Sequence, residues 1–241
     1  MNEIIIDGDI AWYDVSAEYV KNALKGMSGD VTVRVNSPGG YVTEGFAIHN
    51  AIKDYSRGAV TVEIDGIAAS IASYVVMAGD NIVVRENSVM MIHNAWLPAV
   101  GDHRALRKTA DVAEGLTSII AAAYIRRTGR DEKDVRAMMD EETFFYGPEI
   151  VDSGFADSTE DDGAEPMNKI EAMALAQQKF AESVRAANNH WKPDVLEAAA
   201  AYLEQPKPSK KVEDTGTEGG ANASKINALK ARMIMRAKDL K

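Results

Sequence analysis

The sequence predicts an α/β fold, because short β-branched runs alternate along the chain with segments of helical periodicity. Two turns rich in glycine and small residues follow strand-like runs and lead directly into helical patterns. They span Asn36–Gly40 and Asp65–Ser70. Both turns should lie at the carboxyl ends of parallel strands, which is where such folds place their functional sites.

The first half of the chain alternates between the two kinds of element. Ser16 is a favourable cap residue, and Val20 and Leu24 follow it at the spacing of a buried helical stripe. The alternating run Val60–Ile64 is typical of a strand. We expect strands at 3–7, 31–35, 60–64, 82–84 and 89–92, and helices at 16–27, at 41–55 and after Ser70.

The second half is expected to be mainly helical. Apolar residues recur at i, i+3 and i+4 between Arg104 and Arg127, and Gly129 ends this long helix. A proline at the first position favours the start of another short helix. The remaining predicted elements are a helix at 131–139, a strand at 143–146 and a helix at 148–153.

Composition narrows the class of protein. Of the 241 residues, 46% are hydrophobic, yet no apolar run is long enough to span a bilayer. The acid in Met1–Glu3 argues against a signal peptide. A net charge of −10 argues against general affinity for nucleic acid, and the absence of cysteine excludes disulfides and thiol chemistry.

The character of the chain changes near residue 160, where we place the boundary of the compact domain, 1–160. A helical extension is expected at 161–203. Residues 204–224 are rich in Pro, Lys, Gly and Glu and predict a disordered linker. Helical spacing returns at 225–241, where basic residues predominate.

Ser70 and His93 are candidates for a nucleophile and its base. Ser70 lies at a strand-to-helix turn with small neighbours, where unpaired N–H groups favour developing negative charge. The alternative is that Ser70 only caps the helix. His93 ends an apolar strand, whereas His49 and His103 are expected to be solvated and His190 lies outside the domain. A semi-buried structural role is the alternative for His93.

The pair Gly39 and Gly40 directly follows a predicted strand. Adjacent glycines allow the main chain to turn sharply and to present N–H groups to a ligand. An ordinary strand-to-helix turn would use the same residues. The spacing of the glycines does not match a dinucleotide-binding or Walker fingerprint, so nucleotide binding is rejected at this turn.

Taken together, three segments resemble the proteolytic subunit of the Clp protease. They are Asn36–Gly40, Gly66–Ser70 with Ala78 and Gly79, and Asn87–His93. The match in order and separation covers roughly residues 2–158. Gly8–Val15 and Met139–Phe144 look more like the Clp-related head maturation proteases of tailed bacteriophages, which trim scaffold and capsid proteins.

The resemblance implies a Clp/crotonase-type fold of stacked ββα units, and it implies roles for individual residues. Ser70 matches the nucleophile and His93 the general base. The backbone N–H groups of Gly39 and Ile71 match the oxyanion hole. The segment 96–101 matches the strand that binds extended substrate, and the helix from Arg104 matches the element that interlocks subunits into rings. The residues implied to contact substrate are Gly40, Trp96 and Leu97.

The third member of the triad is less well defined. Counting back from Pro148 to the position of the family's aspartate gives Glu142, which is one methylene longer. Other serine hydrolases accommodate glutamate in this role. Asp140 and Glu141 are the alternatives, and a solvated charge in an acidic run is a further interpretation of Glu142.

The expected protein is therefore a serine endopeptidase that works without an ATPase partner and matures a phage prohead. Its substrates would be scaffold and capsid proteins, and its location the host cytoplasm or the prohead interior. No metal, cofactor, membrane or nucleic-acid partner is expected. We do expect the subunits to assemble into a homo-oligomeric ring. The alternatives are a host-type Clp subunit with an ATPase partner, a crotonase-type coenzyme A enzyme and a catalytically silent shell protein.

Overall fold

The structure is a computed structural model that describes residues 2–160, 174 and 178. The expected linker (204–224) and basic helix (225–241) lie outside the described residues, as does the extension at 161–203 apart from 174 and 178. The domain boundary near residue 160 therefore stays a prediction.

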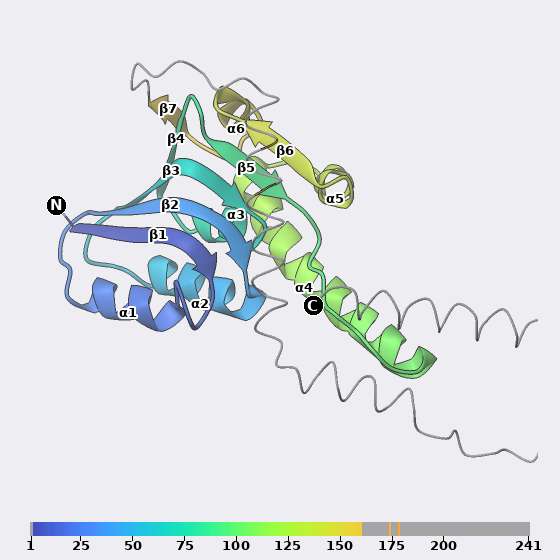
Figure 1. Cartoon of the computed structure of the whole chain (residues 1–241). Helices are drawn as coiled ribbons and strands as arrows, with labels where there is room; N and C mark the ends of the chain where they lie inside the picture. Colours follow the sequence, from blue (N-terminus) through green and yellow to red (C-terminus); the bar gives the residue numbers. More distant parts are fainter. Residues whose placement is uncertain (1, 161–173, 175–177, 179–241) are drawn as a thin grey trace, which may run out of the picture. The chain divides into compact units, whose positions relative to one another are not determined.

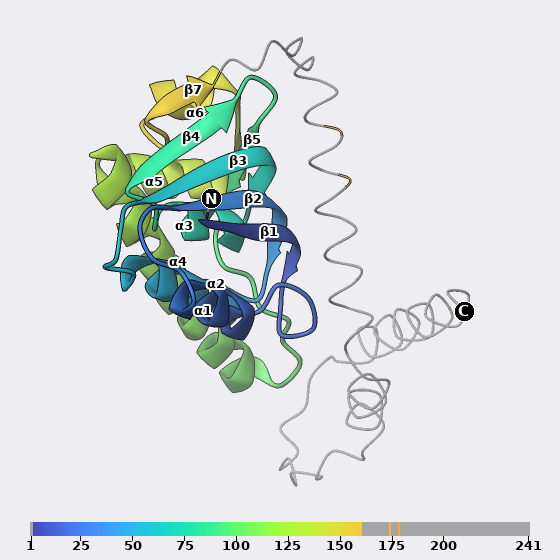
Figure 2. The same cartoon turned by 90° about the vertical axis from the view of Figure 1, so that its left-hand side faces the viewer.

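A seven-stranded sheet forms the centre of the domain, with the order β1-β2-β3-β4-β7. The views in Figure 1 and Figure 2 show β1 to β4 side by side in this order. All neighbours along this path are parallel, whereas β6 is antiparallel to β5. The strands are β1 Asn2–Ile10, β2 Val31–Gly40, β3 Val60–Ala69, β4 Asn81–Arg85, β5 Val89–Ile92, β6 Thr143–Tyr146 and β7 Ser158–Glu160.

Six helices complete the described part of the chain, and the predicted α/β class is confirmed. Ser16 caps the first helix, because its hydroxyl accepts a hydrogen bond from the N–H of Tyr19. Gly129 ends the long helix with a left-handed φ of 66°. The helices are α1 Ala17–Lys25, α2 Val42–Lys53, α3 Ile71–Val76, α4 His103–Thr128, α5 Glu132–Asp140 and α6 Pro148–Asp152.

Strand β3 changes its partner along its length. Residues Thr61–Ile64 pair with β4, whereas Ile67–Ala69 pair with β5. The register sets Ala69 opposite Met91, and one residue beyond the end of β5 lies His93. The change of partner therefore carries the end of β3, and Ser70 after it, to the end of β5.

One face of the sheet is apolar and the other is polar. Alternate residues of β1, β2 and β3 are buried in the main core, to which the apolar side chains of α1 and α2 also contribute. On the other face the guanidinium of Arg34 donates to Asp65 at 2.6 and 2.7 Å. Arg85 contacts the same carboxylate at 3.3 Å. These ion pairs hold neighbouring strands together on the side away from the core.

Only the second half of α4 is buried in the domain, through Thr117, Ile120, Ala121, Ala123 and Tyr124. The first half projects away from the sheet (Figure 1). None of the helices within the described residues is both long and apolar enough to cross a membrane.

Three features differ from the sequence-based expectation. The predicted turns Asn36–Gly40 and Asp65–Ser70 lie almost wholly inside strands, because β2 continues to Gly40 and β3 to Ala69 through pairing with their neighbours. Strand β7 was not expected, because three largely polar residues show no periodicity. The segment 96–101 matches a substrate-binding strand in the family that the sequence resembles. In this structure the segment does not form a strand. A strand is defined by pairing with a neighbour, so an extended segment without a paired neighbour does not become one.

Candidate active site

Ser70 occupies the turn between β3 and α3 in a rarely populated backbone conformation. Its φ is 56° and its ψ is −130°, a combination that non-glycine residues adopt only when the surroundings hold them there. The Ser70 N–H donates to the carbonyl of Met91 at 3.0 Å and so ties the turn to β5. The side chain makes no capping hydrogen bond to α3. The alternative that Ser70 acts only as a helix cap therefore does not describe this turn.

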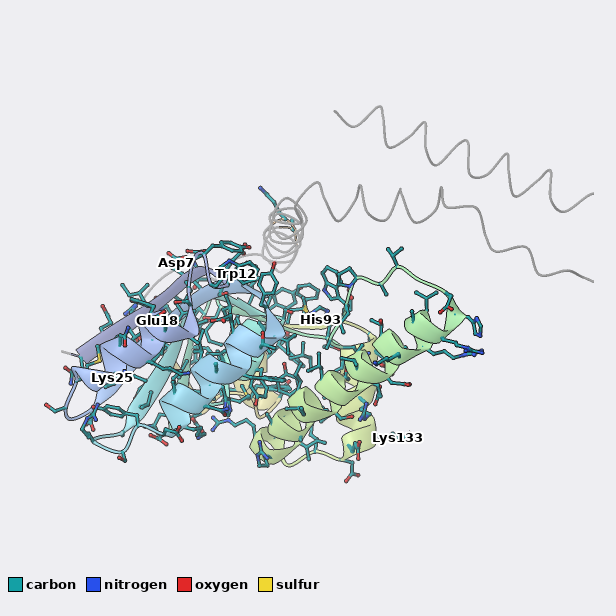
Figure 3. All side chains as sticks on the ribbon, turned by 90° about the horizontal axis from the view of Figure 1, so that it is seen from below. Asp7, Trp12, Glu18, Lys25, His93 and Lys133 are labelled. Carbon is teal, nitrogen blue, oxygen red and sulfur yellow. The ribbon has the colours of Figure 1, made fainter. Side chains whose placement is uncertain are left out.

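The hydroxyl of Ser70 instead meets the imidazole of His93. The distance between Ser70 Oγ and His93 Nε2 is 2.7 Å, which is a short hydrogen bond. Figure 3 labels His93 between the sheet and α4. The two residues are 23 positions apart in sequence. The pairing of β3 with β5 brings them together.

His93 is 6% exposed, and its environment keeps the ring neutral. Burial lowers the pKa of His93 because the charged imidazolium loses hydration. The negative charge of Glu142 acts in the opposite direction, but the net pKa of His93 lies below its ordinary value. At neutral pH the ring is therefore uncharged and able to accept a proton from Ser70.

Glu142 lies on the other side of the His93 ring. Its Oε1 is 3.8 Å from His93 Nδ1, which is close enough for electrostatic attraction but longer than a hydrogen bond. Its φ is 50°, and among the described residues only Ser70 and Glu142 are non-glycine residues with a positive φ. Backbone strain of this kind is concentrated at functional sites, so its coincidence with two candidate residues is informative.

The two alternative acids make other contacts. Asp140 accepts a hydrogen bond of 2.7 Å from the side-chain amide of Asn94. Glu141 is exposed, and its N–H closes the end of α5. The geometry therefore favours Glu142 over Asp140 and Glu141 as the acid beside His93.

Gly39 approaches the serine turn so closely that a side chain would not fit. A Cβ on Gly39 would lie 2.7 Å from Ser70 Cβ and 3.2 Å from the backbone nitrogen of Ile71. The φ of Gly39 is 104°, which also requires glycine. Its N–H donates to Ser37 Oγ at 3.1 Å. The main chain of Gly39, near the end of β2, thus lies beside Ser70 and Ile71, with its N–H already bound to Ser37 Oγ.

An open pocket of about 390 Å³ lies beside His93. The expected substrate-contacting residue Trp96 lines it, whereas Gly40 and Leu97 do not. Gly40 lies against the carbonyl of Ile10 with a φ of 146°. The lining residues are His93, Asn94, Ala95, Trp96, Met139, Asp140 and Glu142. In the described part of the chain, no group of three His, Asp or Glu residues could hold a metal ion.

A model of the Clp protease family matches residues 13–162 of the chain. The chain belongs to the Clp protease family. The matched range contains Ser70, His93 and Glu142, as well as Gly39 and Ile71. The geometry at the ends of β3 and β5 therefore lies wholly within the Clp protease part of the chain.

Three members of the Clp protease family match this chain at 27 to 30% identity. The chain is 27% identical over 159 residues to the ATP-dependent Clp protease proteolytic subunit of Pleurastrum terricola, covering 64% of this chain and 81% of the relative. Subunit 1 of Leifsonia xyli subsp. xyli is also 27% identical, over 60% of this chain and 74% of the relative. Chloroplastic subunit 3 of Arabidopsis thaliana is 30% identical, over 56% of this chain and 44% of the relative.

Several residues around the site of this Clp protease family member were not anticipated. His49, expected to be solvated, is only 8% exposed and stacks on the ring of Tyr74, so that expectation is wrong. Periodicity places His49 on a helix, but it does not show which face of that helix, α2, is covered by α3. The burial of the hydroxyls of Ser73, Thr117 and Tyr124 was not predicted either, because each residue matches the pattern of an ordinary helix.

Replacing Glu142 with glutamine should shift the acidic limb of the pH–rate profile to lower pH. In the wild type, kcat/KM should rise with pH as His93 deprotonates, at a pKa below the ordinary 6.5. The Glu142 charge raises that pKa, so losing it leaves burial unopposed and lowers the pKa further. The plateau should also fall, by about tenfold or more, because the imidazolium loses a stabilising charge.

The matched control is Glu141→Gln, which removes the same charge from the neighbouring exposed residue. Profiles of kcat/KM between about pH 5 and 9 compare the two variants with the wild type. A shift of equal size in Glu141→Gln would contradict a specific role for Glu142.

Proposed function

We propose that this Clp protease family member is a serine endopeptidase with Ser70 as nucleophile and His93 as general base. The observation that carries the proposal is the 2.7 Å hydrogen bond between the strained Ser70 and the buried, neutral His93. A serine hydroxyl is a weak nucleophile until an adjacent base accepts its proton. A serine whose hydroxyl contacts a neutral imidazole in this way meets that requirement.

The reaction follows from the positions of the three side chains. His93 Nε2 takes the proton as Ser70 Oγ forms a bond to the carbonyl carbon of the scissile peptide. The imidazolium then gives this proton to the leaving amine as the C–N bond breaks, which leaves an acyl-enzyme. Water, deprotonated by His93, hydrolyses the ester and restores Ser70. Glu142 stabilises the transient imidazolium, and the 3.8 Å separation would shorten as that charge develops.

The proposed oxyanion hole consists of the N–H groups of Gly39 and Ile71. The argument for it is the close approach of Gly39 to both Ser70 and Ile71. The Gly39 N–H donates to Ser37 Oγ in this structure, so the oxyanion would have to share or replace that bond. Two such donors aimed at the developing negative charge contribute strongly to acyl transfer.

Substrate would bind as an extended strand between Gly40, at the end of β2, and the segment that contains Trp96 and Leu97. These two side chains are 48% and 36% exposed, and their segment is not part of the sheet. A peptide strand could therefore supply the missing ladder partner through main-chain hydrogen bonds, as in β-augmentation. Trp96 also lines the pocket beside His93, where it would contact substrate side chains.

We assign the finer role of prohead maturation from sequence details alone. Gly8–Val15 and Met139–Phe144 resemble the corresponding segments of phage head maturation proteases. The substrates would be scaffold and capsid proteins, cleaved without an ATPase in the host cytoplasm or inside the prohead. Cleavage of purified scaffold protein in the absence of ATP and of any ATPase supports this role. A strict requirement for both contradicts it.

The second candidate is a proteolytic subunit that works with an ATPase. The three relatives described above are all named as ATP-dependent, which favours this candidate. A coenzyme A enzyme of the crotonase type has no evident use for the bonded Ser70 and His93. A catalytically silent shell protein would need neither the hydrogen bond nor the strain at Ser70.

We also propose assembly into a homo-oligomeric ring through α4. Its residues Leu106, Val112 and Ile119 are 45%, 49% and 49% exposed, so α4 carries large apolar side chains that the domain itself does not bury. Association of subunits would bury this surface. Sedimentation of the full chain at low micromolar concentration should show an oligomer, and a fully active monomer would contradict this assembly.

Labelling with a fluorophosphonate tests the proposed function. The reagent phosphonylates an activated serine, so the wild type should gain one label on the peptide that contains Ser70. Ser70→Ala and His93→Ala should remain unlabelled, because one lacks the nucleophile and the other its base. His103→Ala, which changes an exposed histidine at the start of α4, is the control and should label normally. An unlabelled wild type would overturn the proposal.

A further inference from the structure

We infer that α4 positions the Ser70–His93 pair through two buried hydroxyl groups, those of Tyr124 and Thr117. The inference rests on the proposed function, because it concerns residues that align the nucleophile and the base. Both are positioning residues, since each acts through another residue. Tyr124 acts on the Ser70 turn through Ser73, and Thr117 acts on the segment that directly follows His93.

The first connection is a chain of two hydrogen bonds. Ser73 Oγ donates to the carbonyl oxygen of Ser70 at 2.5 Å, and Tyr124 OH lies 2.8 Å from Ser73 Oγ. A serine hydroxyl has one proton, which Ser73 gives to the Ser70 carbonyl. Tyr124 must therefore be the donor to Ser73. The order of donation is fixed, and it runs from α4 to the nucleophile.

Burial makes this chain costly to disturb. Ser73 is 0% exposed and Tyr124 is 1% exposed, so water does not replace either partner. Burial also raises the pKa of Tyr124, so the phenol remains a donor across the range in which the enzyme would work. The Ser70 carbonyl, whose residue has a strained φ, is held by this chain as well as by the N–H of Ser73 at 3.1 Å.

The second connection reaches the other partner of the catalytic pair. Thr117 Oγ1 accepts a hydrogen bond of 3.1 Å from the N–H of Ala95, two residues after His93. Thr117 is 3% exposed. The main chain leaves β5 at Ile92, and within residues 2–160 the segment that follows is not part of a strand. The Thr117 hydroxyl therefore fixes the segment at the point where the sheet no longer does.

Thr117 and Tyr124 are seven residues apart, which is two turns, so they lie on the same face of α4. One rigid helix thus contacts both the Ser70 turn and the His93 segment. A displacement of about 1 Å between reacting groups can reduce a rate by about 100-fold. Fixing both segments to one helix reduces their relative motion, and this is the physical basis of the inference.

The test uses isosteric removal of each hydroxyl, Tyr124→Phe and Thr117→Val, in the full chain. Each variant should lower kcat for peptide hydrolysis by about tenfold, and the double variant by about 100-fold, with KM unchanged. Thr117→Ser keeps the hydroxyl and should restore kcat. Thr109→Val is the control on the same helix, because among the described residues the Thr109 hydroxyl bonds to Ala105, within α4 itself. All rates are measured well below the unfolding temperature.

A second comparison tests whether Tyr124 acts through Ser73. In a Ser73→Ala background the chain of hydrogen bonds is already broken, so adding Tyr124→Phe should lower kcat no further. Equal kcat in the wild type, Tyr124→Phe and Thr117→Val would overturn the inference. So would a further loss of kcat in the Ser73→Ala background.

A structural measurement separates this inference from the proposed function. Crystal structures of the two variants should show the Ser70 Oγ to His93 Nε2 distance lengthened from 2.7 Å beyond hydrogen-bond range. If the wild type fails to label with fluorophosphonate, the proposed function is wrong, yet this distance still decides the positioning role. If the wild type labels and the distance stays at its present value in both variants, only the positioning role is wrong.

Discussion

Replacing Ser70 with alanine should lower kcat/KM for peptide hydrolysis by about 10³- to 10⁶-fold. The variant loses the side-chain oxygen that lies 2.7 Å from His93 Nε2, in a position to attack a carbonyl. Residual turnover would come from the oxyanion donors acting on water. The measurement is the steady-state rate with a fluorogenic peptide, at equal concentrations of folded protein.

His93→Ala should reduce the rate to a similar extent, and the double variant should be no worse than either single variant. The two side chains act as one unit, so removing the second member of a broken pair costs little more. His103→Ala serves as the control. Additive losses in the double variant would mean that Ser70 and His93 act independently, which is incompatible with the proposed mechanism.

Replacing Gly39 with alanine should lower kcat/KM by at least about 100-fold, through loss of oxyanion stabilisation and displacement of Ser70. The added Cβ would lie 2.7 Å from Ser70 Cβ and 2.8 Å from the Ala69 carbonyl oxygen. Real Cβ atoms do not approach so closely, and backbone atoms cannot move aside as a flexible side chain can. The serine turn or the end of β2 must therefore shift.

The control variant Gly29→Ala distinguishes the effect of this steric clash from the effect of backbone strain. Gly29 also has a positive φ, 78°, but nothing lies within 4 Å of the position of its Cβ. Gly29→Ala should therefore lose about 1–2 kcal/mol of stability, and Gly39→Ala at least as much, because its clash adds to the strain. Thermal unfolding measures both. Only Gly39→Ala should also lose activity per folded molecule. Equal activity in the two variants would contradict a role for the Gly39 main chain in catalysis.

The sequence alone was sufficient to predict most of the elements and the two residues that meet at their ends. Alternation of β-branched residues identified β2 and β3, and helical spacing identified α4 up to Gly129. Ser70 and His93 could be chosen because each lies where a strand ends. Such information is local, since a period of two or 3.6 residues can be seen within one segment.

Only the tertiary structure decided which of these segments meet. The change of partner along β3, which brings Ser70 to His93, depends on pairing between residues far apart in sequence. The positive φ of Glu142 and the contacts of Thr117 and Tyr124 also depend on residues that are distant in sequence but close in the folded chain. A helical pattern shows that one face is covered, but the covering atoms belong to distant segments. For this reason the burial and the contacts of the α4 hydroxyls could be identified only in the folded chain.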